Sequence, residues 1–123
     1  MKYLLMIHMN PTIFETLSEE ERNAIFSAHE AFQQPIRESG ELLGFAALAD
    51  PSNSRTVRVR GGVPAVTDGP YVETKEFLAG YYAVDCESVE RAIELAAQIP
   101  DAAIEGLGVE VRQVMFADGL LEA

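Results

Sequence analysis

The chain of 123 residues carries 20 acidic and 9 basic side chains, which gives a formal charge of −11. Such a charge opposes binding to nucleic-acid phosphates and to anionic membrane surfaces, so we expect neither partner. The length predicts one domain spanning residues 1–123, and the lack of a long apolar run or a secretory signal predicts a cytoplasmic protein. Cys86 is the only cysteine, which excludes an intramolecular disulfide, and its apolar surroundings predict a buried thiol.

The first predicted element is a strand over residues 3–9, where nearly every side chain is apolar. The run is too short for a free-standing helix, and Asn10-Pro11 ends it. Because its apolar side chains lie on both sides of the strand, we expect both faces to be covered.

A helix is predicted from Ser18 to Gly40. Ser18 and Glu21 have the spacing of a capping box, and Gly40 is typical of a helix C-terminus. Pro35 is expected to kink this helix or to separate its last turn. One stripe of side chains recurs at helical spacing and consists of Ile25, His29, Phe32 and Ile36.

Further strands and a second helix follow. The polar and β-branched alternation on both sides of Gly61-Gly62 predicts a β-hairpin. Ser88 is expected to cap the second helix, and Pro100 to end it. The predicted strands cover residues 41–48, 55–60, 63–66, 77–86 and 109–116.

The order of these elements predicts an α+β fold. Strand, helix, strand, hairpin, strand, helix, strand is the order of a ferredoxin-like split βαβ unit with an inserted β-hairpin. Two helices cover only one face of such a sheet, whereas strands 3–9 and 77–86 are apolar on both faces. A symmetric partner would bury the second face, so we expect a homodimer with the two sheets packed face to face.

The segment 67–76 gathers charged and turn-forming residues between two apolar runs. It reads Thr-Asp-Gly-Pro-Tyr-Val-Glu-Thr-Lys-Glu, and Asp68, Gly69 and Pro70 predict a rigid turn. The segment resembles the Asp-Gly-Pro-Phe-Ala-Glu-Thr-Lys-Glu (DGPF) motif of one branch of the YCII-related family, with Tyr71 and Val72 in place of Phe and Ala. The resemblance extends over nearly the whole chain and implies that family's dimeric α+β barrel.

His29 and Asp68 are the candidate catalytic residues. Helical spacing turns His29 toward the sheet, where an imidazole needs hydrogen-bond partners. The resemblance implies a His-Asp pair, whose histidine precedes the helix-ending glycine by about three turns, as His29 precedes Gly40. Asp68 is the expected partner, and the pair would exchange a proton with a small molecule. The alternative is a hydrogen-bonded core histidine and an aspartate that caps a turn.

Tyr71, Thr74, Lys75 and Glu76 are candidate substrate-binding residues at the rim of that site. Lys75 would contact an anionic group, with Thr74 donating a hydroxyl. Equally, this segment would form an exposed strand entry, with the Tyr71 ring covering the sheet edge. The two histidines and Cys86 match no zinc spacing, and no glycine-rich phosphate motif is present, so we expect no metal and no cofactor.

Two functions follow from this reasoning. The first is a small dimeric enzyme that uses the His-Asp pair for general acid-base chemistry on a small metabolite. The alternative is a non-catalytic binding or regulatory module, for which the resemblance suggests an extracytoplasmic-function sigma factor as the protein partner. A polar-lined cavity reaching His29 would favour the enzyme, and a filled interior with a wide exposed apolar patch would favour the module.

Overall fold

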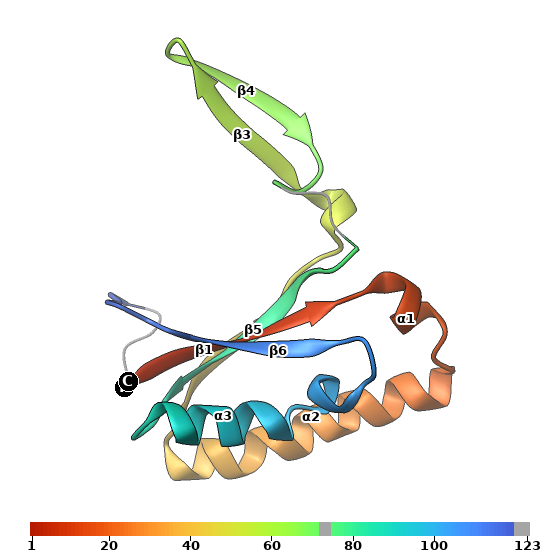
Figure 1. The fold of residues 1–123 in the computed structure, drawn as a ribbon, viewed down its shortest axis with the longest axis vertical. Helices are drawn as coiled ribbons and strands as arrows, with labels where there is room; N and C mark the ends of the chain where they lie inside the picture. The colour runs from red at the N-terminus through yellow and green to blue at the C-terminus, as the bar shows by residue number, and fades with distance from the viewer. Residues whose placement is uncertain (72–74, 120–123) are drawn as a thin grey trace.

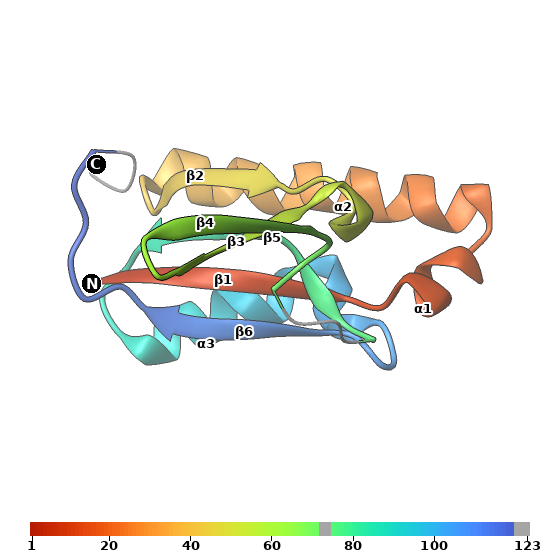
Figure 2. The same ribbon diagram turned by 90° about the horizontal axis from the view of Figure 1, so that it is seen from above.

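The computed structural model describes residues 1–71 and 75–119, which form a four-stranded antiparallel sheet and a separate two-stranded hairpin (Figure 1). Two long helices, α2 (Glu19–Ser39) and α3 (Val89–Gln98), lie against the same face of the sheet (Figures 1 and 2). The hairpin rises on the opposite side. This mixed architecture confirms the predicted α+β class.

The four-stranded sheet has the order β2-β5-β1-β6, and every neighbouring pair is antiparallel. The central strands β1 and β5 were both predicted as long apolar runs, and their positions between other strands explain that composition. The strands are β2 (Leu42–Ala47), β5 (Phe77–Asp85), β1 (Lys2–Met9) and β6 (Gly108–Gln113).

Strand β1 divides its side chains between two different environments. Tyr3, Leu5 and Ile7 are buried on the face that the helices cover, where they join the hydrophobic core. Leu4 and Met6 lie on the other face, opposite Ala83 and Tyr81 of β5, and are only half-buried. No helix among the described residues covers this second face (Figure 1).

Helix α2 begins and ends where the sequence predicts. The side chains of Ser18 and Glu21 each bond the other's backbone N–H, and Gly40 adopts a φ of 82°, which favours glycine. The helix continues through Pro35 to Ser39, so of the two predicted effects of Pro35 the separation of the last turn is wrong, and the kink stays a prediction. Pro35 has no N–H to donate to the Ala31 carbonyl, so the helix continues past it without that backbone hydrogen bond.

The hairpin consists of β3 (Arg55–Arg60) and β4 (Val63–Asp68). Gly61 and Gly62 both have positive φ angles of 57° and 78°, as a two-residue hairpin turn requires. At its base, the Gly69 N–H donates to the Ser54 carbonyl at 2.8 Å, and the Thr56 hydroxyl donates to the Gly69 carbonyl at 2.9 Å.

Three short helical segments were not predicted, and each begins at a proline. They are α1 (Pro11–Glu15), η1 (Pro51–Asn53) and η2 (Pro100–Ala103). Proline is tolerated in the first turn of a helix, so a residue that we interpreted as a break starts a new element. Among the described residues, no helix has the length and hydropathy required to span a membrane.

Candidate functional site

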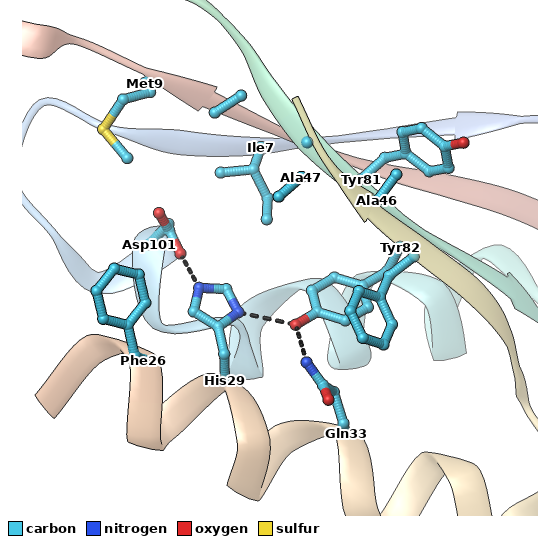
Figure 3. Close-up of a pocket in the computed structure, with 13 residues that line it drawn as sticks. Ile7, Met9, Phe26, His29, Gln33, Ala46, Ala47, Tyr81, Tyr82 and Asp101 are labelled. Atoms are coloured by element: carbon cyan, nitrogen blue, oxygen red, sulfur yellow. Dashed lines mark hydrogen bonds and ion pairs between the residues drawn. The ribbon is translucent and has the colours of Figure 1, made fainter. Parts of the chain in front are cut away.

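The candidate site is built around His29, which projects from α2 toward the sheet (Figure 3). Its Nδ1 lies 2.8 Å from the Tyr82 hydroxyl oxygen, and its Nε2 lies 2.6 Å from Asp101 Oδ1. Gln33 Nε2 donates a hydrogen bond to the same Tyr82 oxygen at 3.0 Å. Four polar side chains therefore form one continuous hydrogen-bonded chain.

Helix α2 contributes two members of this chain because of its periodicity. His29 and Gln33 are four residues apart, so they lie one turn from each other on the same side of the helix. Phe32 and Ile36, from the same stripe as His29, are buried and fix how the helix rests on the sheet. The imidazole and the amide are thereby directed at the sheet surface.

Tyr82 comes from the middle of β5, where it pairs with Leu5 of β1 and Phe45 of β2. The edge of its ring packs against Phe32 with 4.9 Å between ring centroids, and the ring of Phe45 lies 5.5 Å away. These contacts hold the phenol in one orientation, so its hydroxyl meets His29 and Gln33 without further adjustment.

Asp101 is supplied by η2, directly after α3. Ile99 is buried in the core and Pro100 turns the chain, which directs Asp101 beneath α2. Only 3% of its surface is exposed. A carboxylate that is buried to this degree needs a partner, and His29 provides it.

The hydrogen bonds limit where the protons can lie, and the roles of the two His29 nitrogens depend on the tautomer. When Asp101 is ionised it only accepts hydrogen bonds, so His29 Nε2 then carries the proton of this contact. In neutral His29 the other nitrogen then accepts a bond from the Tyr82 hydroxyl. In protonated His29 that nitrogen donates to the Tyr82 oxygen instead. The hydroxyl hydrogen of Tyr82 is then available for a hydrogen bond to another acceptor.

Burial raises the pKa of the Tyr82 hydroxyl above its ordinary value of 10. The hydrogen bond from Gln33 acts in the opposite direction and stabilises the phenolate, while the nearby charge of Asp101 raises the pKa further. Tyr82 is therefore a phenol at neutral pH, and it is available as a proton donor.

This polar chain borders a cavity of about 250 Å³ between α2 and the sheet (Figure 3). A volume of this order lies near the lower limit of ligand pockets, which measure roughly 300–1,000 Å³. Besides His29, Gln33, Tyr82 and Asp101, the described residues that line the cavity are apolar or aromatic. It consists of Ile7, Met9, Phe26, Phe45, Ala46, Ala47, Ala79, Gly80 and Tyr81.

The structure corrects the predicted partner of His29. Asp68 is the last residue of β4 and pairs with Arg55 across the hairpin, with 3.0 Å between Asp68 Oδ1 and Arg55 Nε. Its side chain is 88% exposed, and it does not line the cavity at His29. The His29–Asp68 pair is therefore absent from this chain, because the hairpin carries Asp68 away from the helix (Figure 1).

Three of the predicted substrate-binding residues, Tyr71, Lys75 and Glu76, do not line the cavity. Tyr71 is 74% exposed and its ring lies beneath the Arg58 guanidinium at 5.1 Å. Lys75 borders a separate hollow beside Asn10, and Glu76 borders another beside His8. Thr74 lies outside the described residues.

Sequence reasoning missed three members of the site for different reasons. Gln33 had a usable signal, because it follows His29 by one helical turn. Tyr82 was interpreted only as part of an apolar strand. Asp101 had no local signal at all, since Pro100 was taken as the end of the helix. Within the described part of the chain, no group of three or more metal-ligating side chains is arranged to hold a metal ion.

Comparison with known proteins places this architecture in a family. A YCII-related domain matches residues 1–117. An uncharacterized protein from Rhizobium meliloti (strain 1021) is 31% identical over 112 residues, which cover 91% of this chain and 90% of that protein. The chain therefore belongs to the YCII-related family.

Proposed function

We propose that the protein is a small homodimeric enzyme that uses His29, Asp101 and Tyr82 for general acid-base chemistry on a small metabolite. One observation carries this proposal. Both ring nitrogens of a largely buried histidine are bonded to groups that exchange protons, and the whole chain borders a cavity of about 250 Å³.

The proton transfer follows from the two hydrogen-bonding states of His29. When His29 is protonated, Tyr82 can give its hydroxyl proton to a bound molecule, and the proton on Nδ1 then moves to the phenolate oxygen. His29 is left neutral, and the reverse sequence removes a proton from the molecule. Asp101 orients the imidazole and stabilises its charged form.

The proposal includes the finer assignments that the sequence suggests. We place the chain in the DGPF branch of the family, and we describe its sheet as ferredoxin-like within a dimeric α+β barrel. The strand order β2-β5-β1-β6 and the turn at Gly69, whose φ is 99°, support these assignments. The free, buried thiol of Cys86 is compatible with the reducing cytoplasm, where we place the protein.

A non-catalytic binding module is the second candidate, and one observation favours it. Val57, Val59 and Val66 of the hairpin are each about 60% exposed, and such a cluster is typical of a surface that contacts another protein. A sigma factor of the extracytoplasmic-function type is the partner class for this alternative. The cavity at His29 has no role in it, so the enzyme is our conclusion.

The test is a metabolite screen by thermal shift with the full-length protein and three variants. A ligand of the folded state raises the melting temperature, and His29→Gln and Tyr82→Phe should each reduce that rise. His8→Gln is the matched control, because His8 bonds Glu110 on the open face and does not line the cavity.

Hits that respond to His29→Gln would then be tested for turnover. We expect at least one to be converted by the wild-type protein and not by Tyr82→Phe. Ligands that stabilise the wild type and His29→Gln equally would contradict the proposed site.

A further inference from the structure

We propose that the cavity at His29 selects small, largely apolar molecules that present a hydroxyl or amino hydrogen-bond donor, and that it rejects carboxylates. This inference deepens the proposed function and rests on it in taking this cavity as the substrate site. It concerns the charge and hydrogen-bonding character of the substrate, which the hydrogen-bonded chain around His29 does not define by itself.

The second oxygen of Asp101 is the feature that selects a donor. Oδ1 accepts the bond from His29, and no hydrogen bond from a described residue reaches Oδ2. Yet no fully buried side-chain nitrogen or oxygen among the described residues lacks a partner, so Oδ2 keeps some accessible surface, and Asp101 is one of the residues that line the cavity. Figure 3 shows this oxygen directed away from His29. A carboxylate oxygen in that position only accepts hydrogen bonds.

The charges around the cavity oppose an anionic ligand. Neither lysine nor arginine occurs in its described lining, and the one group there that can become cationic, His29, is already hydrogen-bonded to Asp101. A carboxylate ligand would meet the open Asp101 oxygen with no compensating charge, in surroundings where water screens poorly. A hydroxyl or ammonium group would instead form a charge-assisted hydrogen bond there.

The rest of the lining limits the remainder of the molecule. Apolar and aromatic side chains form most of the wall, and the volume of about 250 Å³ suits one ring or a short branched chain. A ligand without a donor would displace water from the Asp101 oxygen and leave it unpaired. Sites built around a buried polar group discriminate strongly against analogues that lack its partner.

The test compares four probes that share one aromatic ring: benzyl alcohol, benzylamine, benzoate and toluene. Their dissociation constants are measured at pH 7 from the amide NMR shifts of cavity residues such as Ala46 and Gly80 in the full-length protein. We expect benzyl alcohol and benzylamine to bind at least 10-fold more tightly than benzoate, with toluene weaker than benzyl alcohol.

Two variants remove the same charge from different places. Asp101→Asn should abolish the preference for benzylamine over benzoate, because the amide also donates hydrogen bonds. Asp68→Asn is the matched control and should leave all four constants unchanged, since Asp68 lies on the hairpin and not in the cavity lining. If Asp101→Asn folds poorly, Phe26→Lys at the exposed side of the cavity should strengthen benzoate binding at least 10-fold.

Several outcomes would overturn the inference. The first is that the wild type binds benzoate as tightly as benzyl alcohol or more tightly, and the second is that it binds none of the probes. The third is that the selectivity among the probes is unchanged in Asp101→Asn. If Phe26→Lys replaces that variant, the third outcome is unchanged selectivity in Phe26→Lys. Failure here is distinguishable from failure of the proposed function. Benzoate preference combined with turnover that depends on Tyr82 would contradict only the ligand class, whereas correct selectivity without any such turnover would contradict only the acid-base reaction.

Discussion

Two aspartates of this chain have opposite environments, and the difference assigns them different roles. Asp101 is buried beneath α2 and bonds His29, whereas the exposed Asp68 pairs with Arg55 on the hairpin. Removing one partner of a buried pair leaves the other uncompensated, whereas exposed ion pairs contribute little. The sequence motif drew attention to the wrong aspartate.

The two aspartates should therefore differ in their contribution to stability. We expect Asp101→Ala to lower the free energy of unfolding by about 3 kcal/mol, because it leaves the Nε2–H of His29 without its acceptor. Asp68→Ala should lower it by less than about 1 kcal/mol. Urea unfolding at pH 7 measures both, and equal losses would contradict the structure.

The raised pKa of Tyr82 predicts an alkaline effect on stability. A tyrosine in the unfolded chain ionises near pH 10, the ordinary value, whereas the buried phenol resists ionisation. The native state therefore binds the proton more tightly, so this stability is present below pH 10 and is lost as the pH rises through the native pKa.

Tyr82→Phe isolates this contribution, since phenylalanine does not titrate. Between pH 9 and pH 11 the wild type should lose more of its free energy of unfolding than Tyr82→Phe does, as judged by urea unfolding. The other tyrosines contribute equally to both proteins, so equal losses would show that burial does not protect this hydroxyl.

The residues that sequence reasoning could recover are those with local signals. His29 was found because helical periodicity depends only on neighbours along the chain. The true partner of Asp68 was also within reach, because a two-residue turn at Gly61-Gly62 fixes the register that puts Arg55 opposite Asp68. The contact between His29 and Asp101 joins residues 72 positions apart, and no pattern in the sequence reports it.

At the scale of elements, the close approach of β2 and β5 depends on one glycine. A Cβ atom at Gly80 would lie 2.5 Å from the Ala46 carbonyl oxygen and 3.3 Å from the Ala47 Cα. Both are backbone atoms of the neighbouring strand, so they move only if the strands separate. Gly80 also lines the cavity, which connects this packing to the site.

Gly80→Ala should therefore destabilise the protein by about 1–3 kcal/mol, in the range of overpacked interiors. Gly44→Ala is the matched control in the adjacent strand β2, because a Cβ atom there meets nothing within 4 Å. Thermal unfolding of the two variants gives the comparison. Equal melting temperatures would show that the strands are not held as closely as described.

Elements with strong end signals were predicted well, and short ones were not. The capping box and Gly40 fixed α2, and Gly61-Gly62 fixed the hairpin, because each signal acts within a few residues. The segment η2 has four residues and no side-chain cap, so packing against α2 and α3 determines it rather than its own sequence. That segment carries Asp101, which explains why the site was only half predicted.

At the scale of the molecule, no helix or strand of residues 1–71 and 75–119 covers the open face of the sheet or the exposed hairpin. The centre of that face carries Leu4, Met6, Tyr81 and Ala83, which are partly or fully apolar. A two-stranded ribbon with exposed valines is marginally stable by itself. Both features support the proposed homodimer, in which a second copy covers them.

The dimer is tested by multi-angle light scattering at micromolar concentration. The wild type should have twice the mass of one chain, and Met6→Glu should shift it toward the monomer, because the glutamate would be buried between two sheets. Glu20→Gln on the exposed first turn of α2 is a control and should stay dimeric. A monomeric wild type would refute the assembly.

The order of strands and helices could be predicted because each element has its own periodicity. The predicted partner for the second face rests on the same kind of reasoning, because two helices alone cannot cover strands that are apolar on both faces, and it stays a prediction. The direction in which the hairpin leaves the sheet could not be predicted. It depends on the path of residues 48–55 and 69–71 and not on the sequence of the hairpin itself. This placement separates Asp68 from His29.

The central claim, that Asp101 and not Asp68 holds His29, is tested most directly by NMR of the histidine ring nitrogens. Spectra of protein labelled with ¹⁵N-histidine are compared for the wild type, Asp101→Asn and Asp68→Asn, with His8→Gln assigning the two residues. The account predicts a proton on Nε2 of neutral His29 and large changes in its ring signals only in Asp101→Asn. Ring signals that change in Asp68→Asn and stay constant in Asp101→Asn would contradict it.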